Sequence, residues 1–223
     1  MTQIPEKDII HQILEHPNAQ SLVNKINSIL EEERKRRHQF YQDITDEEKV
    51  EFINGVIVTH SPVMKEHNDV SNLLNNLLGN YVRKHQLGYV GVEKVMITLE
   101  RNDYEPDICF FSTKKAKSFK KGQSLFPAPD FVVEILSKGT KKNDRTIKFT
   151  DYEANGIKEY LIIDPLKQIL ELYRLDESKK YDLVLKSGTG LFESEVITGF
   201  SFSIEAIFDE GKNFAALAVI LGS

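Results

Sequence analysis

Two carboxylates stand where this sequence is otherwise apolar, and they are the first residues to which chemistry can be assigned. Glu134 lies in the run FVVEILS, which is apolar on both faces and therefore predicts a central strand. Asp107 opens a second apolar run, DICFF, directly after Glu105 and Pro106. Burying an ionised carboxylate without compensation costs several kcal/mol, so a cation, a metal ion or a raised pKa must accompany each of them.

If the two strands are neighbours, Asp107 and Glu134 converge on one point at the rim of a sheet. Two carboxylates with room for water and phosphate suit Mg²⁺ or Mn²⁺, because both ions prefer oxygen ligands. The structural alternative is an aspartate that caps a turn at a strand end and a glutamate that pairs with a buried lysine or arginine. The residues alone leave both alternatives open.

Lys148 is the candidate for a third functional group. Asp144, Lys148 and Tyr152 are spaced four residues apart, which places them on one face of a helix predicted over 144–155. If that helix packs against the sheet, the ammonium group could orient or deprotonate an attacking water and stabilise charge on a phosphate. An aspartate and a lysine at this spacing also form ordinary salt bridges on protein surfaces.

The elements that must position these residues follow from the hydrophobic pattern. Residues 1–40 predict an N-terminal helical extension, and Asn54-Gly55 predicts the turn of a hairpin. A second helix is predicted over 63–86, because its apolar residues recur on one stripe. Strands are predicted at 89–92, 94–99, 107–111, 131–136, 159–163, 169–174 and 181–185. This order indicates an α/β (α+β) fold with a mixed sheet.

The charge of the chain is unevenly distributed. The 223 residues carry a net charge of −5, yet residues 112–150 contain ten basic and three acidic side chains. A local positive potential attracts a polyanion even when the whole protein is acidic. A solvated, lysine-rich loop is the simpler explanation of the same charge run.

Composition and motifs exclude several classes of protein. One cysteine, Cys109, excludes an internal disulfide framework and a zinc site built on several thiolates. No apolar run approaches the roughly 20 residues of a membrane-spanning helix, and no secretory signal is visible, so we expect a cytoplasmic protein without a membrane partner. Motifs for dinucleotide binding, nucleoside-triphosphate binding, zinc proteolysis and α/β-hydrolase chemistry are absent from the sequence.

Four separate segments of the chain resemble one family of nucleases. These segments are EFINGVIVTHSPVMKEHNDV, PDICFF, PAPDFVVEILSKGT and DRTIKFTDYEANGIKEYLIIDP. In residue type and spacing they are similar to the Uma-type (Uma-two) restriction endonucleases of the PD-(D/E)XK nuclease superfamily. The similarity covers roughly residues 45–185 and leaves residues 1–40 outside it.

The resemblance implies a restriction-endonuclease-like fold, in which a mixed sheet flanked by helices carries a divalent-metal site at one edge. By position, Asp107 corresponds to the aspartate of the PD motif and Glu134 to the acid of the (D/E)XK motif. The superfamily's lysine two positions later is Leu136 here, and in the Uma-type pattern that lysine lies on the following helix, at Lys148. Lys138 stands where the family usually has proline, and it competes with Lys148 for the lysine role.

Two upstream residues also match the family. Glu51 corresponds to the family's upstream glutamate, which could be a further carboxylate near the metal or could simply pair at the edge of a sheet. His67 corresponds to a histidine carried by a helix, which could reach a phosphate or support the site. His60 and His85 are given no functional role.

We therefore expect residues 41–223 to form an endonuclease domain that hydrolyses DNA phosphodiester bonds. Asp107 and Glu134 would bind Mg²⁺ or Mn²⁺, and Lys148 and Glu51 would complete the catalytic set. The basic residues expected to bind the nucleic-acid backbone are Lys138, Lys141, Lys142 and Arg145. The alternative is a catalytically silent domain that binds nucleic acid or a protein. RNA is the less favoured substrate, and a homodimer would pair two active sites.

Overall fold

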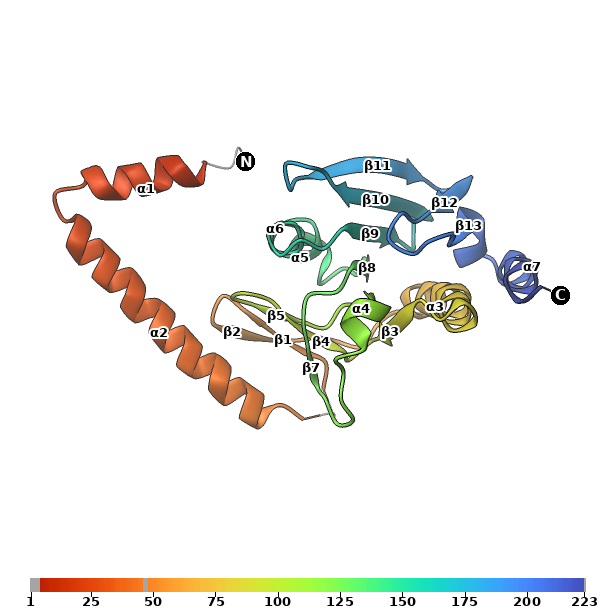
Figure 1. Ribbon diagram of the computed structural model, residues 1–223, viewed down its shortest axis with the longest axis horizontal. Helices are drawn as coiled ribbons and strands as arrows, with labels where there is room; N and C mark the ends of the chain where they lie inside the picture. Colours follow the sequence, from red (N-terminus) through yellow and green to blue (C-terminus); the bar gives the residue numbers. More distant parts are fainter. Residues whose placement is uncertain (1–4, 46–47, 223) are drawn as a thin grey trace.

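The computed structural model describes residues 5–45 and 48–222. The predicted helical residues 1–4 and residues 46, 47 and 223 of the predicted nuclease domain therefore lie outside the described part of the chain. Two sheets and a two-stranded ribbon form the body of the protein (Figure 1).

The larger sheet is the mixed sheet that the sequence predicts. Its strands are β3 (Gly88–Val92), β6 (Ile108–Ser112), β8 (Phe131–Ile135), β9 (Glu159–Asp164), β10 (Ile169–Leu175) and β11 (Tyr181–Ser187). They lie in the order β11-β10-β9-β8-β6-β3. The neighbours β8 and β9 run parallel, and all other neighbouring pairs run antiparallel. The predicted α/β (α+β) fold class is confirmed.

The smaller sheet packs beside the larger one. Its strands are β1 (Val50–Ile53), β2 (Val56–Thr59), β4 (Met96–Thr98), β5 (Asp103–Tyr104) and β7 (Leu125–Phe126). Asn54 and Gly55 connect β1 to β2 with φ angles of 49° and 79°, as the predicted two-residue turn requires. Ile53 pairs with Val56 directly beside this turn, so the turn fixes the register of the whole hairpin.

Helices cover both faces of the larger sheet. They are α3 (Lys65–His85), α4 (Thr113–Ala116), α5 (Lys141–Asp144), α6 (Ile147–Ala154), the 3-10 helix η1 (Ile204–Ile207) and α7 (Glu210–Leu221). On one face, Leu74 and Leu77 of α3 join the core formed by alternate strand residues such as Val133. On the other face, Tyr152 of α6 and Ile97 of the smaller sheet belong to a second core. The sheet is thus enclosed between α3 and α7 on one side and α6 and the smaller sheet on the other.

The helix predicted over 144–155 is in fact two helices. Arg145 and Thr146 separate α5 from α6, and Thr146 leaves the helical region with φ −127° and ψ −85°. Threonine favours this kind of interruption, since its β-branched side chain loses rotamer freedom in a helix and thereby lowers the helix propensity. The predicted end is confirmed, because Gly156 takes a φ of 72° directly after α6.

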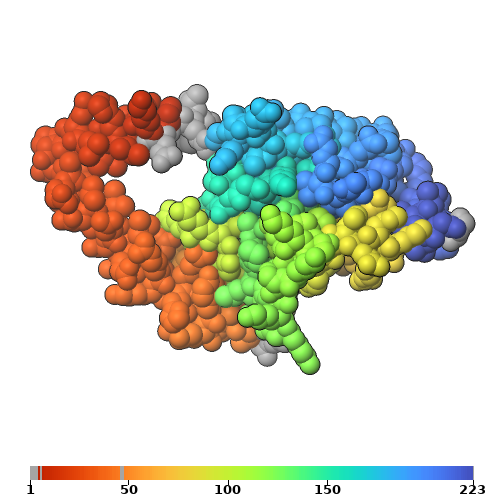
Figure 2. Space-filling model, viewed as in Figure 1, coloured from red at the N-terminus to blue at the C-terminus, as the bar shows by residue number. Residues whose placement is uncertain are grey.

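The N-terminal helical segment is also divided. Its helices are α1 (Glu6–Glu15) and α2 (Ala19–Asp43), with Pro17 between them. The last turns of α2 pack against the smaller sheet, where Phe40 contacts the core around Phe52. Before that point, α1 and residues 19–30 of α2 form an arm that stands away from the body and leaves an opening beside it (Figures 1 and 2).

Several elements were not predicted from the sequence. They are α4, α7, η1, the two-residue strands β5 and β7, and the ribbon of β12 (Leu191–Glu193) and β13 (Ser201–Ser203). Strands of two or three residues are too short to show a periodic hydrophobic pattern. Within the described residues, none of the helices has the length and apolar character that crossing a bilayer requires.

Candidate active site

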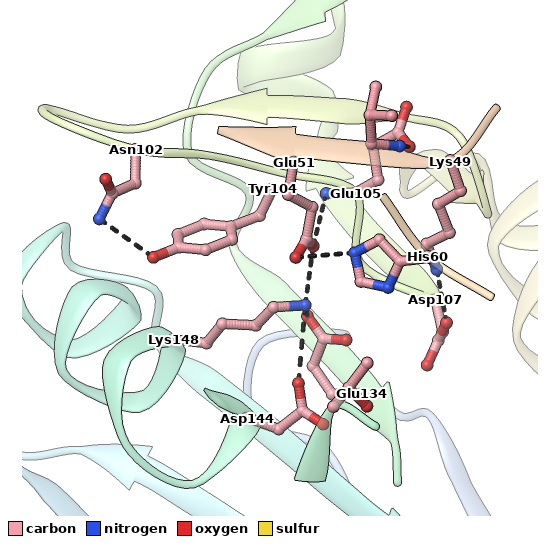
Figure 3. Close-up of polar contacts among 12 residues, drawn as sticks. Lys49, Glu51, His60, Asn102, Tyr104, Glu105, Asp107, Glu134, Asp144 and Lys148 are labelled. Carbon is pink, nitrogen blue, oxygen red and sulfur yellow. Dashed lines mark hydrogen bonds and ion pairs between the residues drawn. The ribbon is translucent and has the colours of Figure 1, made fainter. Parts of the chain in front are cut away.

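A cavity of about 770 Å³ opens where the smaller sheet meets the rim of the larger one. Residues from both sheets line it together with α3, α6 and the loop after β8. Figure 3 shows the charged side chains that approach one another there from the two sheets and α6. The charged residues that line the cavity include Lys49, Glu51, Asp107, Glu134 and Lys148. The predicted candidates Asp107, Glu134, Lys148 and Glu51 therefore all face one space.

Asp107 and Glu134 lie on the same face of adjacent strands. Ile108 pairs with Val133 in the antiparallel register of β6 and β8, so the next position places Asp107 opposite Glu134. The alternating neighbours of both carboxylates point into the core that contains Tyr152. The backbone N–H of Ile135 donates to Asp107 Oδ2 at 2.8 Å, which fixes the aspartate against the end of β8.

Lys148 reaches this pair from α6. Its Nζ lies 3.0 Å from Glu134 Oε1, 2.8 Å from Glu51 Oε1 and 3.6 Å from Asp144 Oδ1. The lysine is 1% exposed, so these carboxylates replace the solvation that it loses. Tyr152, one turn further along α6, donates its hydroxyl to Glu134 Oε1 at 2.7 Å. Although α5 and α6 are separate helices, Lys148 still contacts Asp144, and Lys148 and Tyr152 both contact Glu134, as the predicted common face requires.

Glu51 comes from β1 in the smaller sheet and closes the other side of Lys148. Its Oε1 also accepts the backbone N–H of Glu105 at 3.1 Å, and its Oε2 lies 3.0 Å from His60 Nε2. Glu51 is therefore a buried member of the same cluster of charges and not an isolated residue at the edge of a sheet.

Sequence reasoning missed two residues of the site, Lys49 and His60. Lys49 Nζ lies 2.8 Å from Asp107 Oδ1 and 3.6 Å from Glu93 Oε2. His60 donates its backbone N–H to the Lys49 carbonyl at 2.9 Å, so the two residues extend the hairpin of β1 and β2 by one pair. The register fixed by Asn54-Gly55 was the signal that could have placed both of them near Glu51.

His67 supports Asp107 from α3. Its Nε2 lies 3.1 Å from Asp107 Oδ2, and the residue is buried. The sequence left two roles open for His67, which were to reach a phosphate or to support the site. This contact matches the supporting role, because the ring nitrogen Nε2 is already hydrogen-bonded to Asp107.

The two glutamates that contact Lys148 have pKa values shifted in opposite directions. Burial, together with the charges of Asp144 and Asp107, raises the pKa of Glu134 to about 8, although Lys148 acts in the opposite direction. Burial also acts to raise the pKa of Glu51, but Lys148 and His60 outweigh it and lower that pKa to about 2. Burial alone would lower the pKa of Lys148, yet the surrounding carboxylates hold it well above its ordinary value. Lys148 is therefore a permanent cation in this arrangement.

Comparison with known proteins agrees with the geometry. Residues 37–205 match the profile of the Uma2 family, which is described as "Putative restriction endonuclease". The chain belongs to the Uma2 family. The resemblance found in the sequence is thereby confirmed, and the match extends it into the last turns of α2.

Two individual proteins are also similar to this Uma2 member. A crystal structure of a protein described as a "putative nuclease belonging to DUF820", from Anabaena variabilis, matches with a TM-score of 0.65 and 19% identity. The match covers 80% of this chain and 96% of that chain, and it shows a shared fold. An uncharacterized protein of Synechocystis sp. is 25% identical over 164 residues, which are 72% of this chain and 84% of that protein.

Restriction-endonuclease-like families generally use divalent metals, and the donor set here is compatible with one. The carboxyl groups of Glu51, Asp107, Glu134 and Asp144 outnumber the ammonium groups of Lys49 and Lys148, and the raised pKa of Glu134 shows that this carboxyl has too little positive charge beside it. Within residues 5–45 and 48–222, no group of three or more His, Cys, Asp or Glu side chains could hold an ion by itself. Mg²⁺ is commonly bound by only one or two carboxylates, with water and substrate phosphate as its other ligands. Asp107 and Glu134 fit that mode.

The residues predicted to bind nucleic acid differ in whether their charge is already paired within the protein. Lys138 lines the cavity, and Lys141 and Lys142 are exposed on α5. Arg145 instead forms a two-pronged ion pair with Glu171 of β10, at 2.7 and 3.0 Å. Because Glu171 already pairs with its charge, Arg145 is less available to a nucleic-acid phosphate than these three lysines.

Proposed function

We propose that this protein is a divalent-metal-dependent endonuclease that hydrolyses phosphodiester bonds of DNA. The observation that supports this most directly is the approach of Asp107 and Glu134 to one cavity from adjacent strands, with Lys148 beside Glu134. Membership of the Uma2 family supports the class of nuclease.

In this proposal Asp107 and Glu134 hold Mg²⁺ or Mn²⁺. When bound, the ion supplies Lewis-acid polarisation of the phosphate and lowers the pKa of the attacking water. Lys148 acts as a fixed cation and not as a proton acceptor, because its pKa lies well above the ordinary lysine value. It orients the Glu134 carboxylate and offsets negative charge that develops on the phosphate. Glu51 positions Lys148 from the opposite side.

The test is cleavage of a supercoiled plasmid by the purified protein with Mg²⁺, with Mn²⁺ and with EDTA. We expect cleavage with the ions and none with EDTA. Losing a ligand that contributes several kcal/mol lowers the rate by more than about 100-fold, so Glu134→Gln should be almost inactive. Glu177→Gln, on the exposed turn before β11, is the matched control and should keep wild-type activity. Undiminished cleavage by Glu134→Gln would mean a misplaced site or a contaminating nuclease.

Two groups of lysines within residues 112–150 favour a nucleic-acid substrate. Lys138, Lys141 and Lys142 stand at the cavity and on α5. The stretch between α4 and β7 protrudes from the body (Figure 2) and carries the exposed Lys117, Lys120 and Lys121. Contacts of this kind bind the phosphate backbone without reading sequence. Digestion of DNA and RNA of equal length side by side tests the choice between them.

A catalytically silent binding domain is the second candidate. It is favoured by the fact that both proposed metal ligands already have lysine partners, Lys49 for Asp107 and Lys148 for Glu134. This candidate predicts salt-dependent nucleic-acid binding, no turnover, weak metal affinity in calorimetry and little effect of Lys148→Ala on binding.

We also propose that two copies pair through the arm. The apolar residues of the arm on α2 are Leu22, Val23, Ile26, Ile29 and Leu30, and their spacing is the same when read in either direction. In an antiparallel pair of α2 helices centred on Ile26, every one of these residues would meet another apolar residue, as a two-fold interface requires. Ile26 and Ile29 are exposed in the single chain, which leaves this face available.

A further inference from the structure

The cavity contains a second ammonium group, that of Lys49, to which the proposed function gives no role. Lys49 precedes β1 and contacts Asp107, whereas Lys148 rises from α6 and contacts Glu134 (Figure 3). The two cations therefore approach the pair of proposed metal ligands from different elements.

The two ammonium groups differ in their access to solvent. The side chain of Lys148 is 2% exposed and is enclosed by the carboxylates of Glu51, Glu134 and Asp144. The side chain of Lys49 is 16% exposed, and its second carboxylate partner, Glu93, is 43% exposed. A polyanion that enters the cavity from solvent thus reaches Lys49 before it reaches Lys148.

The two groups also differ in how firmly their charge is neutralised. Lys148 has three buried carboxylates around it. Lys49 has one close partner, Asp107, which it shares with His67 and the backbone N–H of Ile135. A divalent cation on Asp107 would draw on the same carboxylate oxygens and leave Lys49 with an uncompensated positive charge. A phosphate oxygen is the partner that would restore the balance.

Resting on the nuclease function proposed above, we propose that Lys49 is a catalytic residue that contacts a phosphate of the bound nucleic acid beside Asp107. Lys148 then orients Glu134 and offsets phosphate charge from behind the carboxylates, whereas Lys49 contacts a phosphate directly.

The test is the salt dependence of binding to a short DNA duplex in Ca²⁺, followed by fluorescence anisotropy, with a gel to confirm that the duplex stays intact. Each phosphate contact contributes about 0.9 to the slope of log K against log salt concentration. We expect Lys49→Gln and Lys49→Met to lower this slope by about that amount, and Lys49→Arg to keep it. Lys158→Gln, an exposed lysine at the start of β9 and remote from the Ile135 end of the sheet, should keep both slope and affinity.

The two neutral variants are melted in Ca²⁺ first, because an unpaired Asp107 would destabilise the protein without a cation. A wild-type slope in a folded Lys49→Gln or Lys49→Met variant would overturn the phosphate contact while leaving the nuclease proposal intact. Wild-type protein that binds neither DNA nor RNA under these conditions would overturn the proposed function and the role of Lys49 with it.

Discussion

Replacing Lys148 by methionine gives the sharpest test of the charge cluster, because it keeps most of the side-chain volume and removes only the cation. Removing one partner of a buried ion pair costs about 3–5 kcal/mol. We expect the lower end, about 3 kcal/mol, because the pKa of Glu134 is already raised to about 8, so that this carboxyl is largely protonated at pH 7 and loses little when Lys148 is removed. Glu51, whose pKa of about 2 depends on Lys148, bears most of the penalty. For a chain of this size, about 3 kcal/mol corresponds to a fall in Tm of about 6–12 °C.

The measurement is thermal and urea unfolding of wild-type and Lys148→Met protein at pH 7, in EDTA and again in Mg²⁺. Mg²⁺ should restore part of the lost stability, since it returns positive charge to Glu134 and Asp107. A further Glu51→Gln change should be less costly in the Lys148→Met background than in wild-type protein, because the two residues are in contact. Lys158→Met, at an exposed lysine, should change stability by no more than about 0.5 kcal/mol. A loss below about 1 kcal/mol for Lys148→Met in EDTA would refute the inference that its charge is buried among these carboxylates.

Two further outcomes follow from residues outside the cavity. Burial acts to raise the pKa of Glu171, but Arg145, Lys186 and Tyr173 outweigh it and lower that pKa to about 2. The stability that the ionised Glu171 contributes is therefore present at neutral pH and is lost as pH falls from about 4 towards 2. Arg145→Met should therefore cost about 1 kcal/mol at pH 6, a figure limited by solvent screening of the half-exposed arginine, and the difference from wild-type protein should shrink by pH 3 in urea unfolding. A constant difference across that range would contradict the assigned ion pair. In the arm, Ile26→Glu should convert a dimer into a monomer in light scattering while leaving Tm within a few degrees, whereas Asn27→Glu should not; monomeric wild-type protein would rule out the proposed pairing.

Local periodicity was enough to predict part of the candidate site. Alternation along the two strands places Asp107 and Glu134 on the face shared with Cys109 and Val132, because successive residues of a strand point to opposite sides. Four-residue spacing brought Lys148 and Tyr152 to the same carboxylate, even though the predicted helix is broken beside Asp144. In each case the relevant geometry lies within one element and its immediate neighbour.

The set of groups that share the cavity depends on how the two sheets pack against each other. Lys49 and Asp107 are far apart in the chain, and they meet because the smaller sheet packs against the rim of the larger one. Arg145 was expected at the nucleic-acid backbone, but the fold places Glu171 of β10 within reach of its guanidinium. Contacts of this kind depend on how sheets and helices pack, and hydrophobic periodicity carries no information about the position of a charged side chain relative to a distant element. The pattern of this chain therefore predicts the elements, the two acids and Lys148, whereas packing decides the contacts of Lys49 and Arg145.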